Sequence, residues 1–262
     1  MSIQQGFMLE GDVDIEVACA FAADNGFEHV EVNAEGRFHR TRVDPAAVRR
    51  PIERYSLDLV VHLPYALDPG SPHEHVRDGA CRELEAGIDA AAEMGADRAV
   101  FHATTFARSY RWDRETVREA ILDGVERVSA HGRERGVDAV AENLKTDFFD
   151  ADDFPLLFSR TSANACLDTG HAHVTGQGME TQARLLREHG DRISHVHLNE
   201  TRRDDEDEHL PVGIGRLDFE TLARAMVDSD WSGTCTHEVL QFGSGGREYV
   251  AASKRAFDRL RE

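Results

Sequence analysis

Six consecutive apolar segments of this sequence end in a residue that can bind a metal ion. Apolar runs of roughly 4–8 residues predict buried strands. A lone histidine or carboxylate after a strand is more often an ordinary surface or loop residue, but the same position repeated along the chain indicates a shared site. Buried charges also need partners. We therefore expect a metal site built by His62, His102, Glu142, Asp168, His197 and Glu238.

Three further donors follow these strand ends. His171 lies three residues after Asp168, while Asp207 and His209 lie in the long loop after the seventh apolar segment. That loop also contains an acidic run, residues 204–208, whose alternative interpretation is a solvated surface. A set of His, Asp and Glu side chains without cysteine favours zinc, manganese, cobalt or magnesium.

Several other histidines have no predicted role. Single histidines on helices or outer loops are commonly solvent-facing. We expect surface or loop positions for His29, His39, His73, His75, His131, His173 and His189.

Strand-like and helix-like segments alternate along the whole chain. Asp44 followed by Pro45 marks a helix start, and Gly95 and Gly136 mark helix ends. Eight strand–helix units without a linker or repeat predict one (β/α)8 TIM barrel over residues 1–262, with its active site at the carboxyl ends of the strands. The predicted strands are 3–9, 27–32, 57–62, 98–102, 137–142, 164–168, 193–197 and 234–238, and the predicted helices are 12–25, 45–55, 71–94, 113–135, 152–159, 180–189, 218–227 and 247–260.

The composition fits one globular domain. The chain has 262 residues and a hydrophobic content of 40%, which suits a barrel of ~250 residues and disfavours disorder. No segment approaches the ~20 apolar residues of a membrane helix, and the amino terminus lacks the pattern of a signal peptide. The four cysteines are scattered, so buried free thiols are expected. These features favour a cytoplasmic protein.

The charge of the chain is strongly negative. The formal net charge is −19, and only two of the 30 basic residues are lysines. Abundant acids with arginine in place of lysine resemble proteins of salt-loving organisms and suggest a haloarchaeal source. Such a charge normally disfavours nucleic acid, because phosphates are repelled. In molar salt the Debye length falls to ~3 Å, so the charge does not decide between DNA and a small molecule.

Several motifs resemble those of one known superfamily. They are Val60 to Tyr65, Cys166 to His171, His195 to Asn199, His209 to Gly215, and Thr236 to Glu238. On these motifs the chain resembles the xylose isomerase-like barrels, which include sugar and sugar-phosphate isomerases and epimerases as well as type IV AP endonucleases. The resemblance spans nearly the whole chain.

For the sugar enzymes, the resemblance implies one divalent ion that chelates a carbonyl and a neighbouring hydroxyl and stabilises an enediolate. Glu142 and Glu238 would be the catalytic base and acid on opposite faces of this intermediate. His171 and Arg203 would bind substrate oxygens, with Arg202 as an equally placed rival. The metal ligands would be Glu142, Asp168, His197 and Glu238.

For the endonucleases, the resemblance implies three zinc ions and attack on the phosphate beside an abasic site. Glu142 would bridge two ions, and His171, Asp207 and His209 would hold the third. Tyr65 matches an aromatic residue that enters DNA in these nucleases. The zinc ligands would be His62, His102, Glu142, Asp168, His171, His197, Asp207, His209 and Glu238.

Departures from the nuclease pattern favour the sugar enzyme. Phe7 to Gly11 replaces a His-Val-Ser and paired-glycine signature, and Glu31 to Arg37 lacks a basic DNA-wedging segment. Ala103-Thr104 replaces Pro-Gly. We therefore favour a metal-dependent sugar or sugar-phosphate isomerase or epimerase acting on a small-molecule sugar, with the zinc nuclease acting on DNA as the alternative. A barrel that binds metal and ligand without catalysis stays open, because fold kinship does not establish activity.

One loop could bind a phosphate group of the substrate. Gly243 to Arg247 follows the eighth strand, where barrels often bind phosphate through backbone N–H groups and a helix amino terminus. A loop with a solvent-facing arginine is the favoured interpretation. No P-loop or dinucleotide fingerprint is present, so no nucleotide cofactor is expected.

Overall fold

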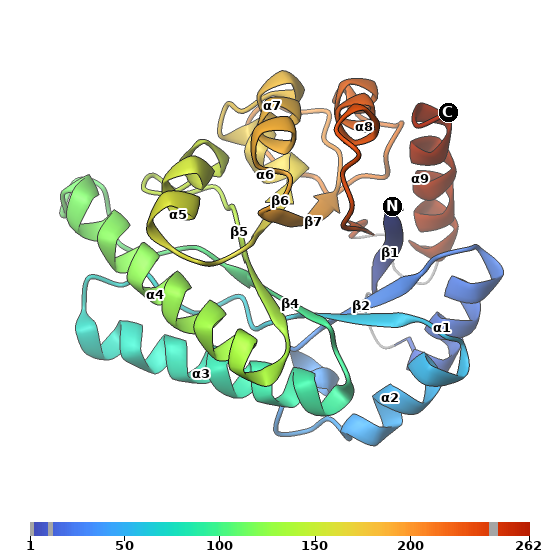
Figure 1. The fold of residues 1–262 in the computed structure, drawn as a ribbon, viewed down its shortest axis with the longest axis horizontal. Helices are drawn as coiled ribbons and strands as arrows, with labels where there is room; N and C mark the ends of the chain where they lie inside the picture. Colours follow the sequence, from blue (N-terminus) through green and yellow to red (C-terminus); the bar gives the residue numbers. More distant parts are fainter. Residues whose placement is uncertain (1–2, 10–12, 241–245) are drawn as a thin grey trace.

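Eight parallel strands form a closed barrel at the centre of the molecule, and helices surround it (Figure 1). The computed structural model describes residues 3–9, 13–240 and 246–262. Each strand pairs with its neighbours in sequence order, and the last strand closes the ring on the first. This arrangement confirms the predicted (β/α)8 barrel.

The strands are short and largely buried, as is usual for parallel sheets covered by helices. Their register brings the carboxyl ends to one rim, where His102 pairs with Glu142, and Asp168 pairs with His197. The strand bounds lie within two residues of the predicted ones. They are β1 Gln4–Leu9, β2 His29–Asn33, β3 Asp58–His62, β4 Arg98–His102, β5 Asp138–Glu142, β6 Ala165–Asp168, β7 Ile193–Leu198 and β8 Thr234–His237.

The helices begin and end at residues suited to those positions. The fourth helix begins after Asp113, whose side chain accepts the Thr116 N–H, and ends at Gly136 in the left-handed conformation (φ 73°). It packs beside the third helix on the outside of the barrel (Figure 1). The helices are α1 Ile15–Asp24, α2 Pro45–Arg54, α3 Glu74–Met94, α4 Arg114–Arg135, α5 Phe154–Arg160, α6 Thr169–Val174, α7 Met179–His189, α8 Phe219–Asp228 and α9 Gly246–Leu260, with short 3-10 turns η1 Gly36–Phe38 and η2 Ala151–Asp153.

The segment after β6 differs from the prediction. No helix was predicted between residues 168 and 180, which is wrong, because residues Thr169–Val174 form α6. Asp168 Oδ1 accepts the backbone N–H of His171 at 2.6 Å and thereby caps this helix. His173, predicted in a surface or loop position, lies on α6 with its Nε2 3.3 Å from Asp204.

The interior of the barrel has an apolar side and a polar side. His29 belongs to the polar side, so its predicted surface position is wrong: the ring is fully buried. Gly6 on β1 leaves room for this ring, since a Cβ there would lie 2.2 Å from His29 Cδ2. The apolar side is formed by Val60, Val100, Val140 and Cys166. The polar side is formed by His29, Glu31, His195, His197 and Thr236, all fully buried.

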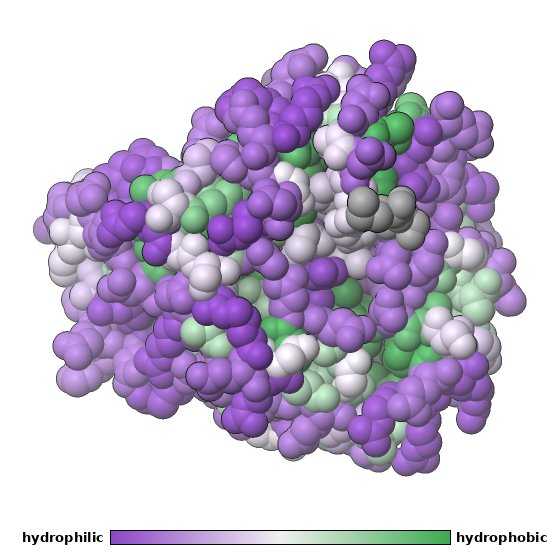
Figure 2. Space-filling model, viewed as in Figure 1, coloured by the Kyte–Doolittle hydropathy of each residue, from purple (hydrophilic) through white to green (hydrophobic). Residues whose placement is uncertain are grey.

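The outer surface is dominated by polar side chains. Figure 2 shows one face covered largely by hydrophilic residues, in keeping with the net charge of −19. The four cysteines are buried and free, as predicted. Within the described part of the chain, no helix is long and apolar enough to cross a membrane.

Candidate metal centre

Four buried side chains meet at the carboxyl ends of β5 to β8. His197 Nδ1 lies 3.2 Å from Glu142 Oε1 and 3.4 Å from Glu238 Oε2. It also lies 3.8 Å from Asp168 Oδ2. One imidazole and three carboxylates around one point can surround a divalent ion. We call this set the inner group: Glu142, Asp168, His197 and Glu238, whose donor atoms lie within 4.8 Å of one another.

The second oxygen of Glu142 faces another pair of donors. Glu142 Oε2 lies 3.2 Å from His62 Nε2 and 3.3 Å from His102 Nε2. We call His62, His102 and Glu142 the side group, and their donor atoms also lie within 4.8 Å of one another. Because its two oxygens face different groups, the carboxylate of Glu142 could contact a cation in each group.

A third set of donors lies beside the inner group, on α6 and the loop after β7. We call it the outer group: His171, Asp207 and His209. Asp207 Oδ2 lies 3.3 Å from His171 Nε2 and 3.4 Å from His209 Nε2. The outer group adjoins the inner one, since His209 Nε2 is 3.7 Å from Glu238 Oε2. The nine donors predicted from the sequence therefore form three adjoining groups.

A buried carboxylate holds the loop that carries Asp207 and His209. Glu200 Oε2 accepts the backbone N–H groups of residues 213–215 at 2.6 to 3.0 Å. Gly213 adopts a φ of 96°, which few residues other than glycine tolerate. Sequence reasoning missed Glu200, because an acid just beyond a strand end usually faces solvent. Its signal was the glycine-rich segment that follows in the same loop.

Two asparagines fix the orientation of Asp168 and were also missed. Asn199 Nδ2 donates to Asp168 Oδ2 at 2.6 Å and to Glu238 Oε2 at 3.2 Å. The Asn143 side chain donates to the backbone oxygen of Asp168 at 3.1 Å and accepts its N–H at 2.9 Å. Each asparagine lies within two residues of a predicted donor in the sequence, and that proximity was the available signal.

Crowding of acids and imidazoles shifts the protonation of the centre. Burial raises the pKa of Asp168 to about 7, with nearby carboxylates adding to this rise and His171 opposing it. Burial would lower the pKa of His171, but attraction to Asp168 and Glu142 raises it to about 10. Burial would likewise raise the pKa of Glu142, but the surrounding imidazoles hold it well below its usual value. A cation that binds Asp168 and His171 would displace the protons held there into the solvent.

A cavity of about 330 Å³ opens onto all three groups. Met8, Leu144 and Leu240 form its apolar part. Tyr65 lines it as well, with the residue 52% exposed and its ring centroid 6.4 Å from that of His102. Among the described residues, no lysine or arginine lines this cavity.

The predicted substrate-binding arginine lies outside the cavity. The Arg203 side chain is 54% exposed, with Nε 3.2 Å from Asp205 and Nη1 2.9 Å from Glu206. Arg202, its rival, is exposed too. A role for either residue in binding substrate stays a prediction. Gly243 to Arg247 was considered as a phosphate loop, with a solvent-facing arginine as the favoured interpretation, and residues 243–245 lie outside the described residues.

The donor set fits divalent metal ions. His171 Nδ1 and Asp207 Oδ2 are buried atoms that have no hydrogen-bond partner. A buried polar atom without a hydrogen bond destabilises a fold by about 1–3 kcal/mol. A cation bound to these two atoms would relieve this cost. Imidazole and carboxylate donors without a thiolate suit zinc or manganese.

Known proteins share the sequence pattern of this chain. Residues 19–262 match the family described as "Xylose isomerase-like TIM barrel". The chain is 29% identical over 200 residues to the uncharacterized protein y4fM of Sinorhizobium fredii, and the alignment covers 72% of this chain and 60% of y4fM. It is 26% identical over 185 residues to a probable endonuclease 4 of Mycobacterium leprae, covering 65% of this chain and 69% of that protein.

Solved structures share the fold. A D-tagatose 3-epimerase-like protein has a TM-score of 0.80 at 19% identity, with 98% of this chain and 97% of that one covered. The TTHB071 protein from Thermus thermophilus, after soaking with ZnCl2, has a TM-score of 0.75 at 26% identity, with 99% and 98% covered. The family match extends over most of the chain, and the chain belongs to the xylose isomerase-like TIM-barrel family.

Proposed function

We propose that this chain is a hydrolase of phosphate esters that works with three divalent metal ions. The observation that carries the proposal is the meeting of nine donors in three adjoining groups, two of which share Glu142. A sugar reaction at one ion needs only the inner group. Burying the other donors without cations would leave polar and charged atoms poorly paired. The three groups therefore shift the balance away from the sugar reaction that the sequence alone favours.

The proposed chemistry divides between the ions and the chain. Bound divalent ions supply Lewis acidity, which polarises the phosphoryl oxygens and acidifies the attacking water. Glu142 belongs to both the inner and the side group, and each of its two oxygens faces the donors of one group. His62 is oriented by its neighbour, because its Nδ1 lies 2.9 Å from the Leu63 carbonyl and its Nε2 then faces Glu142. Without a lysine or arginine in the described lining, recognition of the phosphate depends on the cations.

The cavity limits the form of the substrate. Its volume of about 330 Å³ lies at the lower end of small-molecule sites, so one sugar-phosphate unit fits and a longer substrate must present one unit at a time. The exposed ring of Tyr65 is placed to stack on whatever part of the substrate stays outside. The relative from Mycobacterium leprae that carries the name probable endonuclease 4 makes abasic duplex DNA the first substrate to test.

The test compares two substrate classes on the zinc-loaded protein. We expect cleavage of a labelled duplex with one abasic site, and no cleavage of the same duplex without that site. We expect no interconversion of ketohexose 3-epimers under the same conditions. Epimer interconversion without ester cleavage would contradict the proposal.

The second candidate is a sugar epimerase that uses the inner group alone. It is favoured by the placement of Glu142 and Glu238 on β5 and just after β8, where both line the cavity and could exchange protons with one substrate. It predicts exchange of a substrate C–H with deuterium from heavy water, which Glu238→Gln abolishes. Binding of a sugar or phosphate ester with no turnover would leave the non-catalytic barrel as the remaining candidate.

A further inference from the structure

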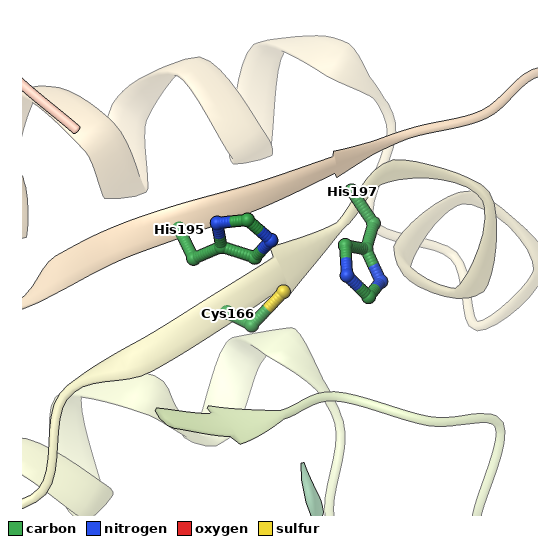
Figure 3. A group of neighbouring side chains, drawn as sticks. All are labelled: Cys166, His195 and His197. Atoms are coloured by element: carbon green, nitrogen blue, oxygen red, sulfur yellow. The ribbon is translucent and has the colours of Figure 1, made fainter. Parts of the chain in front are cut away.

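A further cluster of donors lies inside the barrel, next to the inner group. Cys166, His195 and His197 lie close together on β6 and β7 (Figure 3), with donor atoms within 4.8 Å of one another. Both ring nitrogens of His195 already have partners, Thr234 Oγ1 at 2.5 Å and Glu31 Oε2 at 3.3 Å. Burial raises the pKa of the Cys166 thiol, which disfavours the thiolate that binds metals. The cluster is therefore better explained as a hydrogen-bond network than as a fourth metal site.

Glu31 is the centre of this network. It projects from β2 across the barrel to β7, where its Oε1 lies 3.1 Å from His197 Nε2 and its Oε2 lies 3.3 Å from His195 Nε2. Thr236 Oγ1 on β8 donates to Oε2 at 2.5 Å. The side chain is fully buried. Contacts from two other strands therefore fix the position of the carboxylate.

The contact between Glu31 and His197 decides which nitrogen of His197 is free. An ionised carboxylate only accepts hydrogen bonds, so His197 Nε2 must donate to Glu31. The opposite nitrogen, Nδ1, faces the three carboxylates of the inner group. The partner of one imidazole nitrogen sets the orientation and basicity of the other when that other nitrogen binds a metal.

We infer that Glu31 is a positioning residue, which orients His197 so that Nδ1 points at the metal of the inner group. This inference rests on the metal centre of the proposed function but not on the reaction carried out there. Glu31 does not line the cavity. Its hydrogen-bond partners are His195, His197 and Thr236, and of these only His197 belongs to the inner group, so Glu31 acts through His197.

The surroundings of Glu31 support a dedicated role. A buried carboxylate destabilises a barrel interior unless it is paired, and the opposite side of this interior is filled with valine side chains. Here the supporting contacts continue outward, because His29 Nε2 lies 2.9 Å from Thr236 Oγ1. Gly6 in turn provides the space for the His29 ring. Residues on β1, β2, β7 and β8 thus hold the Glu31 carboxylate in place next to His197.

The test measures zinc affinity of the metal-free protein by competition with a chelating dye. Glu31→Gln keeps the shape but replaces one acceptor oxygen with a donor, and we expect its zinc dissociation constant for the tightest site to rise by roughly 10–100-fold. The matched control is Asp153→Asn, the same acid-to-amide change at a buried carboxylate that pairs with Arg114 and Arg118 away from the centre. We expect the control to bind zinc like the wild type. Circular dichroism checks that each variant is folded.

The outcomes separate this inference from the proposed function. Equal zinc affinity in folded Glu31→Gln and the wild type would overturn the inference alone. If Glu31→Gln does not fold, Thr236→Val removes the hydroxyl that contacts both Glu31 and His29 and should weaken zinc binding by about tenfold. Unchanged affinity in that variant would overturn the inference too. Failure of the wild type to bind zinc would overturn both the inference and the metal centre.

Discussion

The inner and outer groups of donors are held in place by different means. The inner group lies at strand ends whose positions follow from the register of the barrel, and its side chains are at most 10% exposed. The outer group lies on α6 and a loop, with side chains 10% to 17% exposed, and depends on the cap by Asp168 and on Glu200. The strand ends alone supply both the inner group and the side group, since His62 and His102 end β3 and β4. Only the outer group needs residues of a helix and a loop, and loops are where proteins of one fold differ in function.

The largest effect should come from the residue that joins the groups. Glu142→Gln should reduce ester cleavage by about a thousandfold, because several kcal/mol of Lewis-acid stabilisation depend on the cations that this carboxylate holds. Initial rates on the abasic duplex measure the loss. Glu53→Gln, at a side chain 67% exposed on α2, is the control and should keep the wild-type rate. A wild-type rate in Glu142→Gln would refute the bridging role.

Removal of one donor of the outer group should distinguish the role of that group from the role of the inner group. His209→Ala should lower ester cleavage by roughly a hundredfold, the typical effect of losing one stabilising group in an active site. It should leave the inner group able to bind zinc, which titration with a chelating dye measures. His173→Ala on α6 is the matched control, since His173 is not among the cavity-lining residues. Undiminished cleavage by His209→Ala would mean that the outer group takes no part in the reaction.

A change beside the outer group should disturb it by steric means. A Cβ on Gly170 would lie 2.1 Å from Asn199 Oδ1 and 2.5 Å from Asp207 Oδ1. Gly170→Ala should therefore lower the free energy of unfolding by about 1–3 kcal/mol and weaken zinc binding at the outer group. Urea unfolding measures the first effect and zinc titration the second. Gly178→Ala, where a Cβ meets nothing within 4 Å, should change neither. Similar behaviour of the two variants would argue against tight packing at Gly170.

The pH dependence of metal binding should be the smallest effect. Because the pKa of Asp168 is raised to about 7 and that of His171 to about 10, the metal-free protein holds protons at these ligands at pH 6. A cation must displace these protons, so affinity falls as the pH falls, by at least about tenfold from pH 7 to pH 6. Calorimetry in buffers of different ionisation enthalpy measures the protons released. No proton release at pH 6 would contradict these pKa shifts.

The strands and the six donors at their ends could be predicted from the sequence because both follow short-range patterns, whereas the complete set of nine donors was implied only by the resemblance. Apolar runs mark the strands, and a parallel barrel brings all strand ends to one rim. Asp168 shows the limit of this reasoning. The sequence indicated that a strand ends there but not that the same residue caps α6. The salt-loving source and the cytoplasmic location stay predictions.

The polar interior could not be predicted for a different reason. Glu31 and His197 are 166 positions apart, so no local pattern links them. His29 was placed at the surface because a lone histidine is commonly exposed, whereas a glycine on the neighbouring strand makes room for it inside. Such pairings depend on which strands face each other across the closed barrel.

The number of zinc ions per chain tests the central claim most directly. Purified protein is loaded with zinc, dialysed against metal-free buffer, and analysed for zinc and protein by mass spectrometry and amino-acid analysis. We predict about three ions per chain in the wild type, one for each donor group at the cavity, and about two in His209→Ala. One ion per chain in both proteins would contradict the three-ion centre and favour the sugar epimerase.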